Sequence, residues 1–237
     1  SGLRSFASVQ GALVMYPIHA FGSSEQRTKW LSDLGKGIKI GCFGLTEPNF
    51  GSNPGGMATA CKKDGDDWII NGSKMWITGA GHADWFFVLA YTDPSAGYKG
   101  MSGFIVDADS PGIALGKKEE NMGQRCSDTR SVDFVDVRVP AENLIGEKED
   151  DGWMNAMRAF DLSRPTIAAH AVGNARGAME ESLQYANERE TFGQPIYRHQ
   201  GVSFMIADMA TKVEAARLLT WQAAKKADAG ERNTLEA

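Results

Sequence analysis

The most unusual stretch of this 237-residue chain is FGLTEPNFGSN, residues 43–53. It places turn-forming residues and small hydroxyl side chains between two apolar segments. A loop of this kind can bring backbone N–H groups, together with the hydroxyls of Thr46 and Ser52, close to a bound ligand. Composition alone favours an ordinary tight connection over a ligand-binding loop, so the sequence on both sides has to decide between the two interpretations.

The residues before this loop predict helices. Residues 5–34 carry apolar residues at helical spacing, and Pro17 is expected to interrupt that helix. A second helix is expected to begin at Ser23, which can cap it while Gln26 reaches back to the Ser23 backbone. Gly35 is a typical helix end.

Beyond this second helix the pattern changes to that of β-strands. Short apolar segments lie between turn signals at residues 68–70, 85–91 and 103–106. The run Val135–Val139 alternates valines with Asp136 and Arg138, which predicts a strand with one exposed face. Asn71-Gly72 predicts a hairpin turn. The middle third of the chain therefore predicts an antiparallel barrel or sandwich.

From Gly152 onward the pattern is helical again. Pro165 predicts a helix start or a kink, and Gly230 predicts the end of the last helix. Apolar residues recur at helical spacing along that helix, and we interpret them as packing residues, not as a cofactor site: Val202, Met205, Ile206, Met209, Val213 and Ala216. The sequence thus predicts helices, then a β-domain, then a long helical pair.

Composition excludes several classes of function. The net charge is −5, with Lys and Arg scattered among Asp and Glu, so no nucleic-acid surface is expected. No apolar run approaches the roughly 20 residues that span a bilayer, and no targeting signal is visible. Cys42, Cys61 and Cys126 lack metal-ligand spacing and indicate a reduced compartment. Signatures of phosphate-binding loops and zinc sites are absent, so no metal is predicted.

Six ordered segments resemble the acyl-CoA dehydrogenase family. GLTEPNFGSN (44–53) looks like its T-E-P-x-x-G-S-D signature, and NGSKMWITGAGHAD (71–84) looks like its second signature. NMGQRCSDTRSVDFVDVRVPAENLIG (121–146) is similar to the last strands of its β-domain. AFDLSRP (159–165), ERETFGQPI (188–196) and HQGVSFMIADMATKVEAARLL (199–219) are similar to its C-terminal helices.

The resemblance implies a multi-domain α and β architecture. Residues 1–37 would be the end of an N-terminal helical domain. Residues 38–150 would be a middle antiparallel β-barrel domain that binds flavin and acyl-CoA. Residues 151–237 would be the first part of a C-terminal helical bundle.

The resemblance also implies FAD as cofactor. The flavin ring needs hydrogen bonds at its edge, because electrons that arrive there place negative charge on it. Residues of the two signatures would supply the contacts: Phe43, Leu45, Thr46, Gly51, Ser52, Trp76, Ile77 and Thr78. A second group would reach the adenine and pyrophosphate of FAD in a neighbouring subunit: Arg189, Thr191, Phe192 and Gln200. A homo-oligomer, dimer or tetramer, is therefore expected.

Substrate residues follow from the same resemblance. Asp161 and Arg164 would contact the CoA portion, and Ser52 would contact the thioester-bearing substrate or the cofactor. The opening LRSFASVQ resembles glutaryl-CoA dehydrogenases, in which an Arg and a Ser bind a distal carboxylate. Here they fall on Arg4 and Ser8, whose helical spacing lets both face one pocket. An exposed arginine at a helix start is the alternative, and later segments look more like medium- and short-chain enzymes.

The implied activity is oxidation of an acyl-CoA to its 2-enoyl-CoA, with electrons passed to an electron-transfer flavoprotein in fatty acid metabolism. The alternatives are an acyl-CoA oxidase and a non-catalytic flavin-binding fragment. Most relatives remove the α-proton with a glutamate near their C-terminus, so the base is expected beyond Ala237. A minority use a position that is Ser163 here, and Asn53 replaces the usual Asp of the loop. The compartment would be the cytoplasm of a bacterium or the mitochondrial matrix of a eukaryote.

Overall fold

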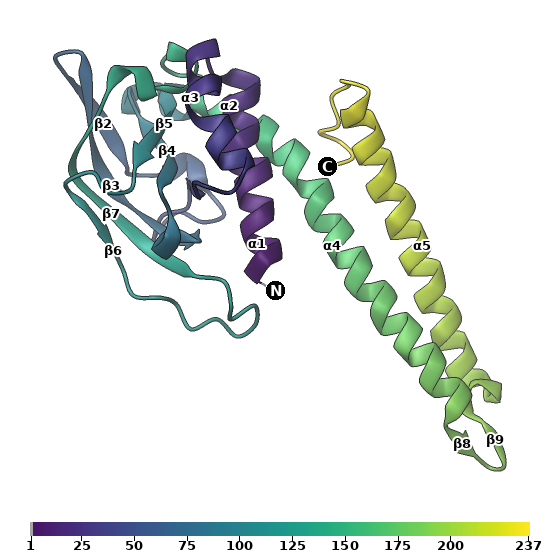
Figure 1. Ribbon diagram of the computed structural model, residues 1–237. Helices are drawn as coiled ribbons and strands as arrows, with labels where there is room; N and C mark the ends of the chain where they lie inside the picture. Colours follow the sequence, from purple (N-terminus) through teal and green to yellow (C-terminus); the bar gives the residue numbers. More distant parts are fainter. Residues whose placement is uncertain (1) are drawn as a thin grey trace. The chain divides into compact units, whose positions relative to one another are not determined.

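A computed structural model describes residues 2–237 of the chain. The chain forms two compact units, which divide between Ala159 and Phe160. The first unit consists of N-terminal helices and a curled β-sheet, and the second consists of a long antiparallel helix pair (Figure 1). None of the helices in residues 2–237 combines the length and the apolar character that a membrane span requires. The predicted succession of helices, β-domain and helices is confirmed.

The N-terminal helices follow one another with little interruption. They are α1 (Gly2–Ser8), a π-helical stretch (Val9–Met15), α2 (Tyr16–Phe21) and α3 (Ser24–Gly35). The expected interruption at Pro17 is wrong, because Pro17 lies inside α2. Proline lacks the N–H that would continue the helical ladder. The ladder widens just before it, where the N–H of Tyr16 bonds the carbonyl of Gly11, five residues back.

The predicted capping of α3 is confirmed. The Ser23 hydroxyl accepts from the Gln26 backbone N–H at 3.3 Å, and the side-chain Oε1 of Gln26 accepts from the Ser23 backbone N–H at 3.0 Å. Gln26 is buried, and its amide also donates to the carbonyls of Glu142 and Leu144 at 2.8 and 2.6 Å. One side chain therefore caps the helix and fastens it to the segment that follows the sheet.

Seven strands form a mixed sheet in which most neighbouring strands pair antiparallel. They are β1 (Gly41–Gly44), β2 (Ala60–Asp64), β3 (Asp67–Thr78), β4 (Trp85–Tyr91), β5 (Met101–Asp107), β6 (Ile113–Leu115) and β7 (Thr129–Val139). Their order is β1-β4-β2-β3-β7-β6, with β5 on β4. Only the contacts of β4 with β1 and with β2 are parallel. Short 3₁₀ turns lie between strands at Pro54–Gly56, Ala80–His82 and Pro94–Gly100, and two more follow β7, at Ala141–Asn143 and Ile145–Glu147.

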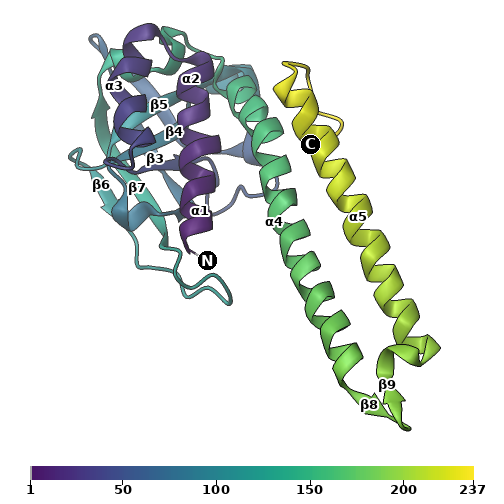
Figure 2. The same ribbon diagram turned by 45° about the vertical axis from the view of Figure 1, so that its right-hand side comes forward.

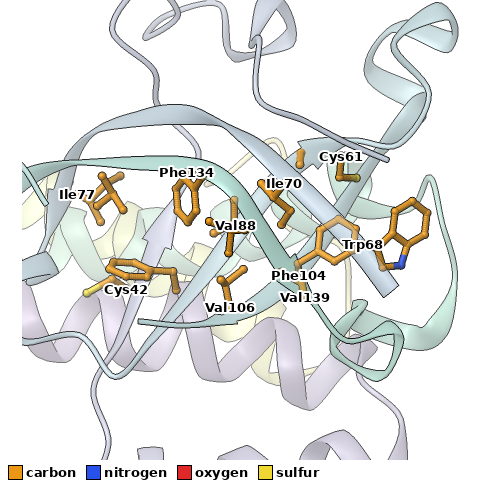
Figure 3. Close-up of a cluster of buried hydrophobic side chains, with 14 of the residues drawn as sticks. Cys42, Cys61, Trp68, Ile70, Ile77, Val88, Phe104, Val106, Phe134 and Val139 are labelled. Atoms are coloured by element: carbon orange, nitrogen blue, oxygen red, sulfur yellow. The ribbon is translucent and has the colours of Figure 1, made fainter. Parts of the chain in front are cut away.

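The core of the first unit lies on the inner face of the curled sheet (Figure 3). Ile70, Val88 and Phe104 are completely buried there. Trp68 meets Phe104 edge to face, with ring centroids 5.6 Å apart. Burial of each such side chain stabilises the fold by about 1.5–3 kcal/mol, so this cluster fixes the sheet that carries the loop of residues 43–53.

The hairpin predicted at Asn71-Gly72 is wrong, because both residues lie in the middle of β3. The turn into β3 is made by Gly65 and Asp66, since Asp64 pairs with Asp67 and Gly65 has φ +66°. Gly72 is glycine for another reason. Its φ is +153°, and a Cβ there would overlap Thr59.

The predicted alternation in β7 holds only in part. Val137 and Val139 are buried, but Val135 is 61% exposed. Asp136 has φ +51°, and the pairing of β3 with β7 slips by one residue at this point. This β-bulge inverts the alternation, so that Phe134 replaces Val135 on the inner face. The Asn71 side chain accepts from the Asp136 N–H at 2.9 Å and holds the bulge.

The second unit contains most of α4 (Gly152–Glu188), a two-stranded hairpin of β8 (Glu190–Thr191) and β9 (Gln194–Pro195), a 3₁₀ turn (Ile196–Arg198) and α5 (Gln200–Asp228). The two long helices run antiparallel, and the hairpin joins them at one end (Figure 2). α4 continues through Pro165, so the predicted helix start there is wrong. Gly230, with φ +73°, follows the end of α5 as predicted.

The apolar residues of α5 are only partly covered. Val213 is buried, whereas Met205 and Met209 are 58% and 39% exposed. A pair of helices buries one narrow face of each partner, and the predicted apolar residues spread beyond that face. Their interpretation as packing residues therefore holds for Val213 and not for the two methionines in the described unit.

Candidate functional site

The loop of residues 43–53 leaves the sheet at the end of β1 and turns back at once. The N–H of Glu47 bonds the Phe50 carbonyl at 3.2 Å, and the N–H of Phe50 bonds the Glu47 carbonyl at 3.1 Å. Gly51, Ser52 and Asn53 follow on the surface. The turn thus presents a small, polar and exposed segment next to the sheet.

A buried ion pair anchors this loop. The Lys74 ammonium, on β3, lies 2.9 Å from the Glu47 carboxylate, and their side chains are 0% and 4% exposed. Lys74 also donates to the Leu45 carbonyl at 3.2 Å. The Glu47 carboxylate accepts from the N–H groups of Ala58 and Thr59 at 2.6 and 2.9 Å. The pair is therefore bonded to the loop at Leu45 and to its return segment at Ala58 and Thr59.

Burial and charge act against each other in this pair. Burial lowers the pKa of Lys74 from 10.5 to about 8, although the Glu47 carboxylate opposes the change. Burial also acts to raise the pKa of Glu47, but the Lys74 charge and the N–H donors outweigh it and lower that pKa below 4.5. Both groups are charged near neutral pH.

Trp76 stands in a strained conformation next to this pair. Its φ is +63°, in the left-handed region that non-glycine residues rarely adopt, and its side chain is 56% exposed. The pairing of β3 with β7 slips between Lys74 and Ile77, so an extra residue bulges out here. The N–H of Met75 bonds the Thr46 carbonyl at 2.8 Å. That bond joins the bulge directly to the loop of residues 43–53.

The predicted flavin residues of the first unit thus fall on two adjoining segments. Trp76, Gly51 and Ser52 are exposed, and Thr46 and Thr78 are half-buried. Phe43 stacks on Phe87, with ring centroids 5.5 Å apart. The side chains of Leu45 and Ile77 are buried, so these two residues can offer a ligand only their backbone. An exposed indole beside exposed hydroxyl and backbone groups suits a planar ligand with a polar edge, and a flavin ring has both properties.

The second group of predicted flavin residues gathers at the hairpin end of the second unit. Phe192 and Gly193, with φ +53° and +76°, form the hairpin turn, and Phe192 is 97% exposed. The Thr191 hydroxyl lies 2.9 Å from a ring nitrogen of His199, just before α5 begins at Gln200. Arg189 is also exposed. An exposed guanidinium near the N-terminus of a long helix suits a phosphate group.

The two predicted CoA residues lie close together on α4. Arg164 pairs with Asp161 at 3.2 Å, and Arg164 is the more exposed of the two. The Thr234 hydroxyl donates to the Asp161 carboxylate at 2.6 Å, and the amide of the buried Asn233 donates to the Asp161 carbonyl at 3.0 Å. Residues from the end of the chain therefore fix the geometry of Asp161.

Arg4 and Ser8 are both half-buried. The Nε atom of Arg4 is buried and has no hydrogen-bond partner among residues 2–237. The neighbouring Ser5 donates to the Gln124 side chain at 2.6 Å. A buried donor without a partner is costly, which makes an anionic ligand favourable at this position.

Sequence reasoning missed three residues of this arrangement: Glu47, Lys74 and Asn233. A signal for Lys74 was available, because Trp68, Ile70 and Lys74 share one face of β3 at even positions. A charged residue on an inward face indicates a buried partner. For Asn233 no local pattern identifies the partner, which lies 72 residues earlier.

Most of the chain matches models of known protein domains. Residues 1–38, 42–137 and 150–237 match the N-terminal, middle and C-terminal domains of acyl-CoA dehydrogenases. The chain is 48% identical to a probable medium-chain specific acyl-CoA dehydrogenase of Caenorhabditis briggsae, over 95% of this chain and 56% of that protein.

Solved structures agree. Butyryl-CoA dehydrogenase from Megasphaera elsdenii superposes with a TM-score of 0.94 at 41% identity, over 98% of this chain and 61% of that one. A glutaryl-CoA dehydrogenase from Mycobacterium smegmatis in complex with FADH2 gives 0.86 at 39%, over 95% and 57%. The chain thus spans little more than half the length of these relatives. With three family domains matched in order at such identity, the chain belongs to the acyl-CoA dehydrogenase family.

Proposed function

We propose that the protein to which these residues belong binds FAD and oxidises an acyl-CoA to the corresponding 2-enoyl-CoA. The observation that carries the proposal is the junction of the loop and the Trp76 bulge, joined by the Met75–Thr46 hydrogen bond and by the buried Lys74–Glu47 pair. This junction places the exposed indole of Trp76 beside polar groups of the loop. A similar protein, the glutaryl-CoA dehydrogenase from M. smegmatis, is described in complex with FADH2.

In this proposal each group of residues has one task. Bound FAD would supply the acceptor for the hydride that leaves the β-carbon of the substrate. Trp76 would flank the flavin ring, and the backbone around Leu45 and Thr46 with the Thr78 hydroxyl would bond its polar edge. Ser52 would contact the cofactor or the thioester. Asp161 and Arg164 would hold the CoA portion.

The adenylate half of FAD would lie against the hairpin residues Arg189, Thr191 and Phe192, with Gln200. We propose that these residues serve the FAD of a neighbouring subunit in a homo-oligomer, and that electrons pass onward to an electron-transfer flavoprotein. Ser163 cannot be the base that removes the α-proton. Its hydroxyl is a far weaker base than a carboxylate, and it is buried and bonded to the Phe160 carbonyl at 3.3 Å.

Glutaryl-CoA is the substrate that Arg4 favours. Its buried Nε has no partner among the described residues, and a distal carboxylate would supply one. The similarity to butyryl-CoA and medium-chain enzymes favours an uncharged acyl chain instead. Both substrate classes therefore belong in the assay.

The test uses the full-length protein. Its cofactor is released by denaturation and identified by mass, and acyl-CoA oxidation is then followed with an artificial electron acceptor and, separately, with oxygen alone. We expect FAD and turnover that requires the acceptor. Oxygen-dependent turnover would indicate an acyl-CoA oxidase, and FAD without turnover would indicate a non-catalytic flavoprotein. FMN, a nicotinamide or no cofactor would contradict the proposal.

A further inference from the structure

The buried Lys74–Glu47 ion pair is not explained by its contribution to the stability of the fold. Removing two charges from water costs several kcal/mol for each ion, and their mutual attraction commonly offsets that cost without a surplus. Buried pairs of this kind can often be replaced by apolar residues without loss of stability. Stability alone therefore does not account for a completely buried lysine inside a strand whose other buried residues are Trp68, Ile70 and Ile77.

The contacts of the pair point to its task. Lys74 bonds the Leu45 carbonyl, and the Glu47 carboxylate bonds the Ala58 and Thr59 N–H groups. Lys74 thus holds the loop from β3 at Leu45 and Glu47, and the Glu47 carboxylate ties the loop to the return segment at Ala58 and Thr59. Two residues further along the same strand, Trp76 takes its strained left-handed conformation.

Resting on the function proposed above, we propose that the Lys74–Glu47 pair is a positioning element for the flavin. It sets the orientation of the Leu45–Thr46 backbone relative to Trp76, and so determines both the affinity for FAD and the reduction potential of the bound flavin. Neither side chain is exposed enough to touch a ligand, so the pair acts through the loop and the bulge.

Variants that remove the charges of Lys74 and Glu47 distinguish an effect on flavin binding from an effect on folding. In the full-length protein, Lys74→Met removes the ammonium and keeps most of the side-chain volume, which leaves Glu47 as an uncompensated buried charge. Lys74→Met combined with Glu47→Gln removes both charges and keeps a carbonyl acceptor at residue 47. Lys63→Met is the matched control, because Lys63 also pairs with a glutamate at 2.6 Å but is 61% exposed.

Three quantities are measured for each variant: the Tm of the apoprotein, the FAD dissociation constant, and the midpoint potential with the absorption spectrum of the bound flavin. We expect Lys74→Met to lower the Tm and to weaken FAD binding about 10-fold or more. The double variant should recover most of the Tm but keep the weakened binding, the shifted potential and the altered spectrum. The control should match the wild type in all three.

A double variant that recovers its Tm and binds FAD with wild-type affinity and potential overturns the inference, because the pair would then serve the fold alone. A wild-type protein without flavin would overturn the proposed function instead, so the two failures are distinguishable.

A pH titration of the wild-type protein tests the same inference without a variant. Burial lowers the pKa of Lys74 to about 8, whereas that of Tyr91, the titratable residue of β4 that faces Glu47, is raised above 10.0 by burial and by Glu47. Loss of the Lys74 proton should therefore change FAD affinity and the flavin spectrum between about pH 7 and 9. A flat response over that interval, together with an insoluble double variant, also overturns the inference.

Discussion

Asn233 replaces the hydrogen bond that Pro165 cannot make. Within α4, the Asp161 carbonyl would be bonded by the N–H of residue 165, but proline has none. The Asn233 amide donates to that carbonyl at 3.0 Å and to the Ala223 carbonyl at 3.3 Å, and the Asn233 side chain is only 5% exposed. A residue beyond the end of α5 therefore lets α4 continue through a proline.

The first prediction concerns this bond. Asn233→Ala should lower the free energy of unfolding by about 1–3 kcal/mol, because it leaves a buried carbonyl without a donor. Pro165→Ala should reduce that loss, since residue 165 then regains its N–H. The measurement is a double-mutant cycle in urea, with Thr234→Val as control for the neighbouring, exposed hydrogen bond to Asp161. Strictly additive effects of the two substitutions would contradict the interpretation.

Local patterns predicted what local physics decides. The capping box at Ser23 and Gln26 needs only residues three apart, and it was confirmed. The succession of helices, strands and helices follows from periodicity, and the family resemblance correctly implied a β-domain between two helical parts.

Long-range pairing decided what the sequence could not predict. Asn71-Gly72 has the composition of a turn, but a glycine is required at residue 72 because Thr59 leaves no room for a Cβ there. In the sequence Val135 fits the alternation of buried and exposed residues, yet a bulge at Asp136 moves its side chain to the surface. The pair of Lys74 and Glu47 joins residues 27 apart, on a strand and on a loop, and no local rule connects them.

The second prediction concerns pH. The folded pKa of Lys74 is lowered from 10.5 to about 8, so in this interval the unfolded chain binds more protons than the folded one. The destabilising contribution of Lys74 is thus fully present below pH 8 and is relieved as the pH rises toward 10.5. The gain is at most about 3.5 kcal/mol, because one pKa unit corresponds to about 1.4 kcal/mol.

Urea unfolding between pH 7 and 10 measures this term as the difference between the wild type and Lys74→Met. As the pH rises, the free energy of unfolding of the wild type should increase relative to that of Lys74→Met. A difference that does not depend on pH would show that Lys74 keeps an ordinary pKa.

The third prediction concerns the strained Trp76. Trp76→Gly should leave the fold as stable as before or stabilise it by about 1 kcal/mol, because glycine adopts φ +63° without strain. The same substitution should weaken FAD binding, since the exposed indole is lost. Gly79→Ala is the converse control: its φ is +80°, so alanine should destabilise the protein. Thermal unfolding and FAD titration, run side by side, check both halves, and undiminished FAD affinity would exclude Trp76 from the site.

The fourth prediction concerns the hairpin end of the second unit. Arg189→Ala should weaken FAD binding in the assembled oligomer by about 1–3 kcal/mol, the range for a lost hydrogen bond to a charged group. Arg198→Ala is the matched control, because Arg198 lies on the adjoining 3₁₀ turn and is also exposed. FAD retention is measured by fluorescence after dilution. Equal retention in both variants and the wild type would remove Arg189 from the cofactor site.

The last prediction concerns substrate choice. The buried Nε of Arg4 has no partner among the described residues, so an aliphatic acyl chain placed against it would leave a guanidinium group unsatisfied. A distal carboxylate would form a bidentate, charge-assisted pair with it.

In the full-length enzyme, kcat/KM for glutaryl-CoA should exceed that for hexanoyl-CoA, and Arg4→Ala should reduce this preference about 10- to 100-fold. Arg4→Lys should restore it only in part, because an ammonium group cannot pair in the bidentate manner. Arg176→Ala, which removes an exposed arginine from α4, should leave the ratio unchanged. A wild-type preference for hexanoyl-CoA that Arg4→Ala does not alter would mean that Arg4 faces no substrate, and the protein would then belong with the straight-chain enzymes that its later segments resemble.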